Sequence, residues 1–174
     1  GTYGAVQPNY LIVGINVPSQ LGTHWVSTST MCEYEVTLQV AYNTSKTSVT
    51  VPFWNSYVGN YSDDPLYCAV GSYDAIYMLV DAMDRGDGFA ADTIVTKLED
   101  NNIASPYEGA AGMIAFTPRV TTSGSEGQHD LVAGYDYASA LFCQWQSGGT
   151  KVVLPAGDTA VGLYPNSFAT GTLA

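Results

Sequence analysis

Two histidines are the residues of this chain that could carry acid–base chemistry. His24 lies between Thr23 and Trp25, and no Gly-x-Ser-x-Gly sequence supplies a nucleophile for an imidazole to activate. His129 and Asp130 could form an orienting pair, but neighbouring residues on a strand point to opposite faces. We therefore predict that the chain is not an enzyme and has no catalytic residue.

The cysteines, Cys32, Cys68 and Cys143, are odd in number. One disulfide and a free thiol is one arrangement, and three buried, inert thiols is the other. No Cys-x-x-Cys pair occurs and neither histidine is near a cysteine in the sequence, so no zinc site is expected. The sequence leaves the disulfide pairing open.

Carboxylates gather in two turns, at Asp63-Asp64 and from Asp84 to Gly88, where a hard cation such as Ca²⁺ could bind. Neither turn has the ligand spacing of an EF-hand loop with its terminal glutamate. Solvated turn carboxylates are therefore the expectation, with no metal and no cofactor.

Two sequons are present, Asn43-Thr44-Ser45 and Asn60-Tyr61-Ser62. Both fall where a loop or a helix end is expected, so Asn43 and Asn60 are candidate glycosylation sites on an exported chain. The alternative is a pair of unmodified polar turns.

The charge balance limits the partners of the chain. Its 174 residues are 46% hydrophobic and only 12% charged, and 16 acidic against 5 basic residues give a net charge of −11. Such a charge repels phosphate backbones, so a nucleic-acid partner is not expected. The composition, poor in Lys and rich in Ser, Thr, Gly and Tyr, is typical of an extracytoplasmic protein, periplasmic or at the cell surface.

One long amphipathic helix is predicted over residues 69–85. Apolar residues recur at three- and four-residue spacing, and Gly86 stands where a left-handed helix end is favoured. We expect one stripe of this helix to be buried in the main core: Val70, Tyr73, Tyr77, Val80 and Met83.

The remaining elements give an α/β chain with about three helices. Residues 1–9 form an arm, 10–155 an α/β domain and 156–174 a tail. Apolar runs and alternation predict a buried strand at 10–15, a strand at 33–42 and a strand at 113–117. In the strand at 33–42, Val36 and Leu38 lie on the apolar face and Thr37 and Gln39 on the polar face. Capping signals predict a helix from Thr50 and another from Ala90 or Ala91 to Asp100, and a glycine turn predicts a hairpin of 139–146 with 150–154.

A colinear series of short segments resembles one protein family. The chain is similar to the C-terminal part of a solute-binding protein of the branched-chain amino-acid ABC transporter type, which has the type I periplasmic-binding fold. The matching segments are Gly14 to Gln20, Cys32 to Leu38, Val51 to Trp54, the helix from Pro65 to Gly86, Asp92 to Glu99, Tyr107 to Phe116, His129-Asp130 and Gln144 to Gln146. Proteins of that family are longer and have two lobes, so the resemblance implies a truncated, partial sheet.

The resemblance also implies a ligand site. Asn16, Val17 and Gln20 match the loop that places polar groups against the ligand's amino end, and Tyr67 matches an aromatic residue of the cleft. Because Asn and Gln stand where a carboxylate would pair with an ammonium, a neutral or aromatic solute is as plausible as an amino acid. The implied function is capture of a small molecule for an ABC permease.

The strands that the family would place at the centre of the sheet are absent from this chain. Unpaired strand edges cost free energy unless another chain satisfies them. The alternative function is therefore a self-associating structural protein of the cell surface that has the fold without solute binding. In both cases we expect partners, either copies of the chain or the missing half.

Overall fold

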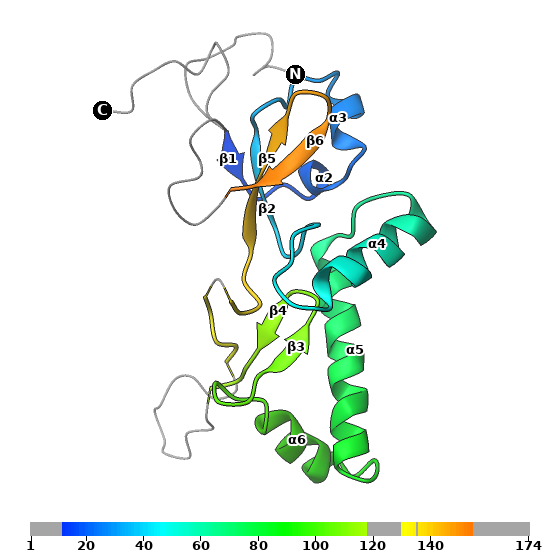
Figure 1. The fold of residues 1–174 in the computed structure, drawn as a ribbon, viewed down its shortest axis with the longest axis vertical. Helices are drawn as coiled ribbons and strands as arrows, with labels where there is room; N and C mark the ends of the chain where they lie inside the picture. Colours follow the sequence, from blue (N-terminus) through cyan, green and yellow to red (C-terminus); the bar gives the residue numbers. More distant parts are fainter. Residues whose placement is uncertain (1–11, 118–129, 135, 155–174) are drawn as a thin grey trace, which may run out of the picture.

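Two groups of elements make up the structure, and Figure 1 shows them at opposite ends of an elongated molecule. The computed structural model describes residues 12–117, 130–134 and 136–154. One group is a mixed sheet with short helices beside it, and the other contains the longer helices and a small hairpin. The expected α/β class is confirmed, whereas the predicted arm at 1–9 and tail at 156–174 lie outside the described residues.

The sheet contains β1 (Val13–Gly14), β2 (Val36–Gln39), β5 (Leu141–Gln146) and β6 (Thr150–Val153), in the order β1-β2-β5-β6. β1 runs parallel to β2, while β2 with β5 and β5 with β6 are antiparallel. The turn between β5 and β6 holds Gly148 and Gly149 at φ values of +90° and +82°. The predicted C-terminal hairpin is therefore confirmed, with the glycines where positive φ is required.

The prediction of a buried strand at 10–15 is wrong for the residues that the structure describes. Only Val13–Gly14 form a strand, and the side chains of Val13 and Ile15 are 53% and 78% exposed. β1 lies at the edge of the sheet, and among the described strands it pairs with β2 alone. A continuous apolar run is typical of a strand covered on both faces, and the described residues supply no such cover.

β2 corrects a second expectation, since its polar residues are buried together with its apolar ones. Val36 is buried as predicted, but Thr37 and Gln39 are also buried, and Leu38 is only half-buried. The short helix α2 (Val17–Gln20) covers this strand, and the hydroxyls of Ser19 and Thr37 share a hydrogen bond of 2.6 Å between Oγ and Oγ1. A hydrogen bond replaces water at Thr37, which offsets the cost of burying its hydroxyl.

The second group contains α4 (Thr50–Tyr61), α5 (Tyr67–Arg85), α6 (Ala91–Glu99) and the hairpin of β3 (Tyr107–Gly109) with β4 (Gly112–Ile114). The three predicted helices are confirmed with small shifts of their ends, while β3 was not expected and β4 is shorter than the predicted strand. One cluster of buried apolar residues packs these elements together with the segment after β2: Ala41, Phe53, Val70, Ala110 and Ala111. Trp54, Ala82, Ile114 and Ala115 are buried as well.

The buried face of α5 differs from the predicted stripe. Val70 is fully buried, but Tyr77 and Val80 are 54% and 56% exposed, while Asp74 and Ala82 are buried. The reason is the β3–β4 hairpin, because the carboxylate of Asp74 binds its backbone and turns that side of the helix inward. The face with Tyr77 and Val80 is only partly covered, since the Tyr77 ring contacts that of Tyr73 at 4.6 Å between ring centres.

Gly86 ends α5 for a different reason from the one expected. Its φ is −92°, and the left-handed residue is Asp87 at φ +53°. A Cβ on Gly86 would lie 2.9 Å from Thr93 Cγ2 and 3.1 Å from the Ala82 carbonyl oxygen. The glycine therefore allows the close approach of α6 to the end of α5.

Candidate functional site

The predicted ligand residues Asn16, Val17 and Gln20 lie on and just before α2, which follows β1 directly. Asn16 and Val17 are exposed, whereas Gln20 is 4% exposed. Ser19 anchors the helix, because its hydroxyl donates to the Asn16 carbonyl at 2.7 Å and its carbonyl accepts from Trp145 Nε1 at 3.0 Å. Asn16 and Val17 thus face solvent from a fixed turn, while Gln20 faces the interior.

Tyr67 is the first residue of α5, and its side chain is 53% exposed. The loop before it is attached to the chain that follows α2. Asp63 Oδ1 accepts a hydrogen bond of 2.8 Å from the backbone N–H of Gly22 and another of 2.8 Å from that of Asp64. The segments that carry Gln20 and Tyr67 are therefore joined, although no contact between these two side chains is formed.

Lys151 makes a second connection between the same segments. Its Nζ lies 2.8 Å from Asp64 Oδ2, donates to the Gln20 carbonyl oxygen, and is 4.8 Å from the centre of the Trp145 ring. The Lys151 side chain is only 1% exposed, against 19% for Asp64. Burial lowers the pKa of the Lys151 ammonium, and the charge of Asp64 opposes that shift. Sequence patterns did not single out Lys151, because a lysine on a strand usually faces solvent.

Two glutamine oxygens in this region are buried without a hydrogen-bond donor among the described residues. They are Gln20 Oε1 and Gln39 Oε1, while Gln39 Nε2 donates to the Gln20 carbonyl at 3.5 Å. A buried acceptor without a donor costs about 1–3 kcal/mol. An N–H donor that reached Gln20 would remove that cost, which is a property suited to a polar ligand or an ordered water.

His24 has a structural environment. It is 8% exposed, its Nε2 lies 3.1 Å from Glu35 Oε2, and its ring centre is 5.9 Å from that of Trp145. It belongs to α3 (His24–Ser27) and packs against Trp145 of β5. His129 lies outside the described residues, and Asp130 is exposed.

The remaining candidate groups are placed as follows. Cys32 and Cys143 are buried, Cys68 is exposed, and all three are free, so neither a disulfide nor three buried thiols is found.

The two sequon asparagines are both exposed. Asn43 lies in a loop, and Asn60 lies in the last turn of α4, where its Nδ2 donates to the Ser56 carbonyl at 2.7 Å. The described residues contain no cluster of three or more His, Cys, Asp or Glu arranged to hold a metal.

Three cavities of the described part of the chain lie along the helices, and none of them is lined by the four predicted ligand residues. The largest, about 530 Å³, is a groove between α4 and α5 with an aromatic wall of Phe53, Tyr57, Tyr61, Tyr73 and Tyr77. A second, about 500 Å³, lies at the end of α5 beside Val80, Met83 and Phe89.

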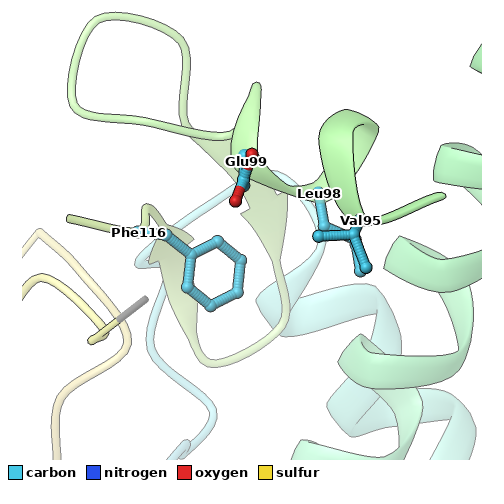
Figure 2. Close-up of a pocket in the computed structure, with 4 residues that line it drawn as sticks. All are labelled: Val95, Leu98, Glu99 and Phe116. Carbon is cyan, nitrogen blue, oxygen red and sulfur yellow. The ribbon is translucent and has the colours of Figure 1, made fainter. Parts of the chain in front are cut away.

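The third cavity is small and apolar, about 180 Å³ (Figure 2). Val95, Leu98 and Glu99 come from α6, and the ring of Phe116 extends toward them from the segment after β4. Its small size and its mainly apolar lining of Val95, Leu98 and Phe116 do not suit a polar solute.

Within the described residues, no helix combines the length and the apolar character that a membrane span requires.

Comparison with sequence-family models gives no match, and no curated protein sequence matches. Solved structures do match in fold. A substrate-binding protein of an ABC transporter from Desulfitobacterium hafniense, in complex with Leu, has a TM-score of 0.59 at 19% identity, over 87% of this chain and 38% of that one. A leucine-binding protein of Thermotoga maritima has a TM-score of 0.53 at 16% identity, over 77% of this chain and 33% of that one.

A type 1 periplasmic binding protein of Bordetella pertussis is also similar, with a TM-score of 0.57 at 13% identity, over 88% of this chain and 41% of that one. The chain thus spans well under half the length of these structures. At such identities the likeness concerns the fold, and the chain has the fold of part of a type I periplasmic binding protein.

Proposed function

We propose that the chain is part of an extracytoplasmic solute-binding protein that captures a small molecule, such as an amino acid, for an ABC permease. The observation that carries this proposal is the fold, which it has in common with transporter substrate-binding proteins over 71–88% of its own length. One of those proteins holds leucine, which makes a small amino acid the first solute to test.

The solute would lie at the C-terminal end of β1, where Asn16, Val17 and Gln20 follow the strand. In α/β folds, ligands bind at the carboxyl ends of strands because loops and helix starts converge there. Tyr67, at the start of α5, supplies an exposed aromatic ring on the joined loop.

The second wall of the cleft would come from outside this chain. The similar proteins are more than twice as long as the matched part, and α5 exposes Ile76, Tyr77, Leu79 and Val80 along one face. Large exposed apolar faces mark contact surfaces. In this proposal, the missing half of the binding protein would cover the exposed face of α5.

A second candidate function is a self-associating structural protein of the cell surface without solute binding. The same exposed face of α5 favours it, because a copy of the chain could cover that face as well. Solute binding separates the two proposals, since only the first requires it.

Isothermal titration calorimetry of the folded chain tests the first proposal, with neutral amino acids, aromatic amino acids and small carboxylates as solutes. We expect heat with at least one of them, and a loss of affinity of about tenfold, or 1.4 kcal/mol, in Tyr67→Ala. Tyr61→Ala is the matched control, because Tyr61 is also exposed, at 69%, but lies in the groove between α4 and α5. No heat with any solute from a folded preparation would move the assignment to the structural alternative.

A further inference from the structure

The buried ion pair of Lys151 and Asp64 connects the two groups of elements. Lys151 belongs to β6 of the sheet, and Asp64 belongs to the loop between α4 and α5. Among the described residues, the backbone crosses between the groups at 40–49, after β2, and at 136–140, before β5. The ion pair is thus a side-chain connection between the sheet and the α4–α5 loop, which Figure 1 shows next to α2.

The surroundings of Lys151 hold its ammonium in one place. Besides Asp64, the Gln20 carbonyl accepts one of its hydrogens, and the rings of Trp145 and Tyr42 lie 4.8 and 5.4 Å away. The backbone N–H of Lys151 donates to the Tyr42 hydroxyl at 3.3 Å. A buried cation with these partners cannot move without losing charge-assisted contacts, and a solvated surface lysine has no such restriction.

The two groups that Lys151 bridges carry the proposed ligand residues. Gln20 ends α2 on the sheet side, and Asp64 lies three residues before Tyr67 at the start of α5. Asp63 adds a parallel contact through the Gly22 N–H at 2.8 Å. Two contacts therefore join the end of α2 to the loop before α5, and the Lys151–Asp64 pair is the one whose lysine is almost fully buried.

We propose that Lys151 is a positioning residue: through Asp64 and the Gln20 carbonyl it fixes the loop before α5 against the end of α2. The effect of Lys151 on solute binding rests on the proposed function. Its effect on the relative position of α2 and the loop before α5 does not.

The native thiol of Cys68 and an added one at Ser147 allow a direct test. Cys68 is exposed at the start of α5, Ser147 is exposed in the β5–β6 turn, and the other two cysteines are buried. Spin labels on Cys68 and on Ser147→Cys report the distance between the two groups by pulsed electron resonance. We expect a single narrow distribution in the parent protein and one at least twice as broad in Lys151→Met.

Two further variants separate positioning from stability. Lys151→Met leaves Asp64 without its partner and should lower the melting temperature, while Lys151→Met with Asp64→Leu replaces the pair by apolar groups and should recover it. A positioning role predicts that the distribution stays broad in the double variant. A narrow, parent-like distribution in the folded double variant would overturn the proposal.

Lys97→Met is the matched control, because Lys97 pairs with Asp100 at 3.2 Å on the surface of α6 and should leave the distribution unchanged. If Lys151→Met does not fold, Asp64→Asn breaks the same pair from the loop, and the same broadening is expected. When a solute binds, its affinity should fall at least tenfold in the double variant. Broadening without any solute binding in the parent would support the positioning role and refute the proposed function.

Discussion

The carboxylate of Asp74 accepts a hydrogen bond of 2.6 Å from the backbone N–H of Ala110, and its second oxygen accepts one of 2.9 Å from Ala111. This contact attaches the middle of α5 to the turn of the β3–β4 hairpin. Asp74 is 4% exposed, and the alanines are at most 4% exposed. The two elements are therefore held together by a buried charged group and not by apolar packing alone.

Replacing Asp74 by Ala should destabilise the chain by about 3 kcal/mol. The change leaves two buried N–H groups without acceptors, and hydrogen bonds to charged groups each contribute about 1.5–3 kcal/mol. Urea unfolding followed by circular dichroism measures the loss. Asp81→Ala is the control, since Asp81 pairs with Arg85 at the surface and should change stability by about 0.5 kcal/mol or less. Equal effects of the two changes would contradict this account of Asp74.

The pH dependence of stability should reveal the same carboxylate. Burial raises the pKa of Asp74 above its ordinary value of 3.8, and the Ala110 and Ala111 N–H groups only partly oppose the shift. A raised folded-state pKa means that the folded state binds the proton more tightly, so this contribution to stability is complete below pH 3.8 and is lost as the pH rises through the raised pKa. Relative to Asp74→Asn, the free energy of unfolding should fall across that window. A relative free energy that rose with pH would show that the two hydrogen bonds outweigh burial.

Gly112 and Gly71 should respond to alanine in opposite directions. Gly112 has a φ of +134°, and a Cβ there would lie 2.5 Å from the Tyr137 carbonyl oxygen. Gly112→Ala should therefore cost about 3 kcal/mol through strain and overlap. Gly71 is on the exposed side of α5, and a Cβ there would have nothing within 4 Å, so Gly71→Ala should stabilise the chain by about 0.5–1 kcal/mol. Thermal unfolding checks both variants: the melting temperature should fall in Gly112→Ala and rise in Gly71→Ala.

Sequence periodicity predicted the helices well and their buried faces poorly. The spacing of Val70, Tyr73 and Tyr77 identified α5, yet the side that is buried includes Asp74, which no hydrophobic pattern selects. Burial of that carboxylate depends on Ala110 and Ala111, which are distant in sequence and come close only in the folded chain.

The candidate site shows the same limit. Asn16 and Gln20 were chosen from the family resemblance alone, and Gln20 lies on α2 and not in the expected loop. Lys151 could not be found in this way, because its partner Asp64 and the Gln20 carbonyl belong to other elements. A single lysine on a strand gives no sequence signal of burial until those partners are known.

Thiol labelling should distinguish the three cysteines. In the native state we expect one rapidly reacting thiol, Cys68, because Cys32 and Cys143 are buried and free. Burial raises the pKa of Cys143 to about 12 and also raises that of Cys32, so neither forms much thiolate near neutral pH. Titration with an aromatic disulfide reagent should give one fast thiol before unfolding and three after it. Loss of any thiol from the unfolded, unreduced chain would reveal a disulfide.

The exposed face of α5 should govern how the isolated chain associates. Ile76, Tyr77, Leu79 and Val80 are 39–61% exposed along this face, and water contact with such a surface is unfavourable. We expect light scattering of the purified chain to give a mass above that of the 18.5 kDa monomer, decreasing on dilution.

Tyr77→Asp should shift that equilibrium toward the monomer. It should also lower the monomer's own stability by about 1 kcal/mol, because the Tyr77 ring contacts that of Tyr73 at 4.6 Å. Val26→Asp is the control, since Val26 is 78% exposed but lies on α3 in the other group of elements. The net charge of −11 opposes self-association, so added salt should strengthen it by screening. A monomer at every concentration and salt level would mean that this face does not drive association of the chain with itself, leaving the missing half of a binding protein as the partner to test.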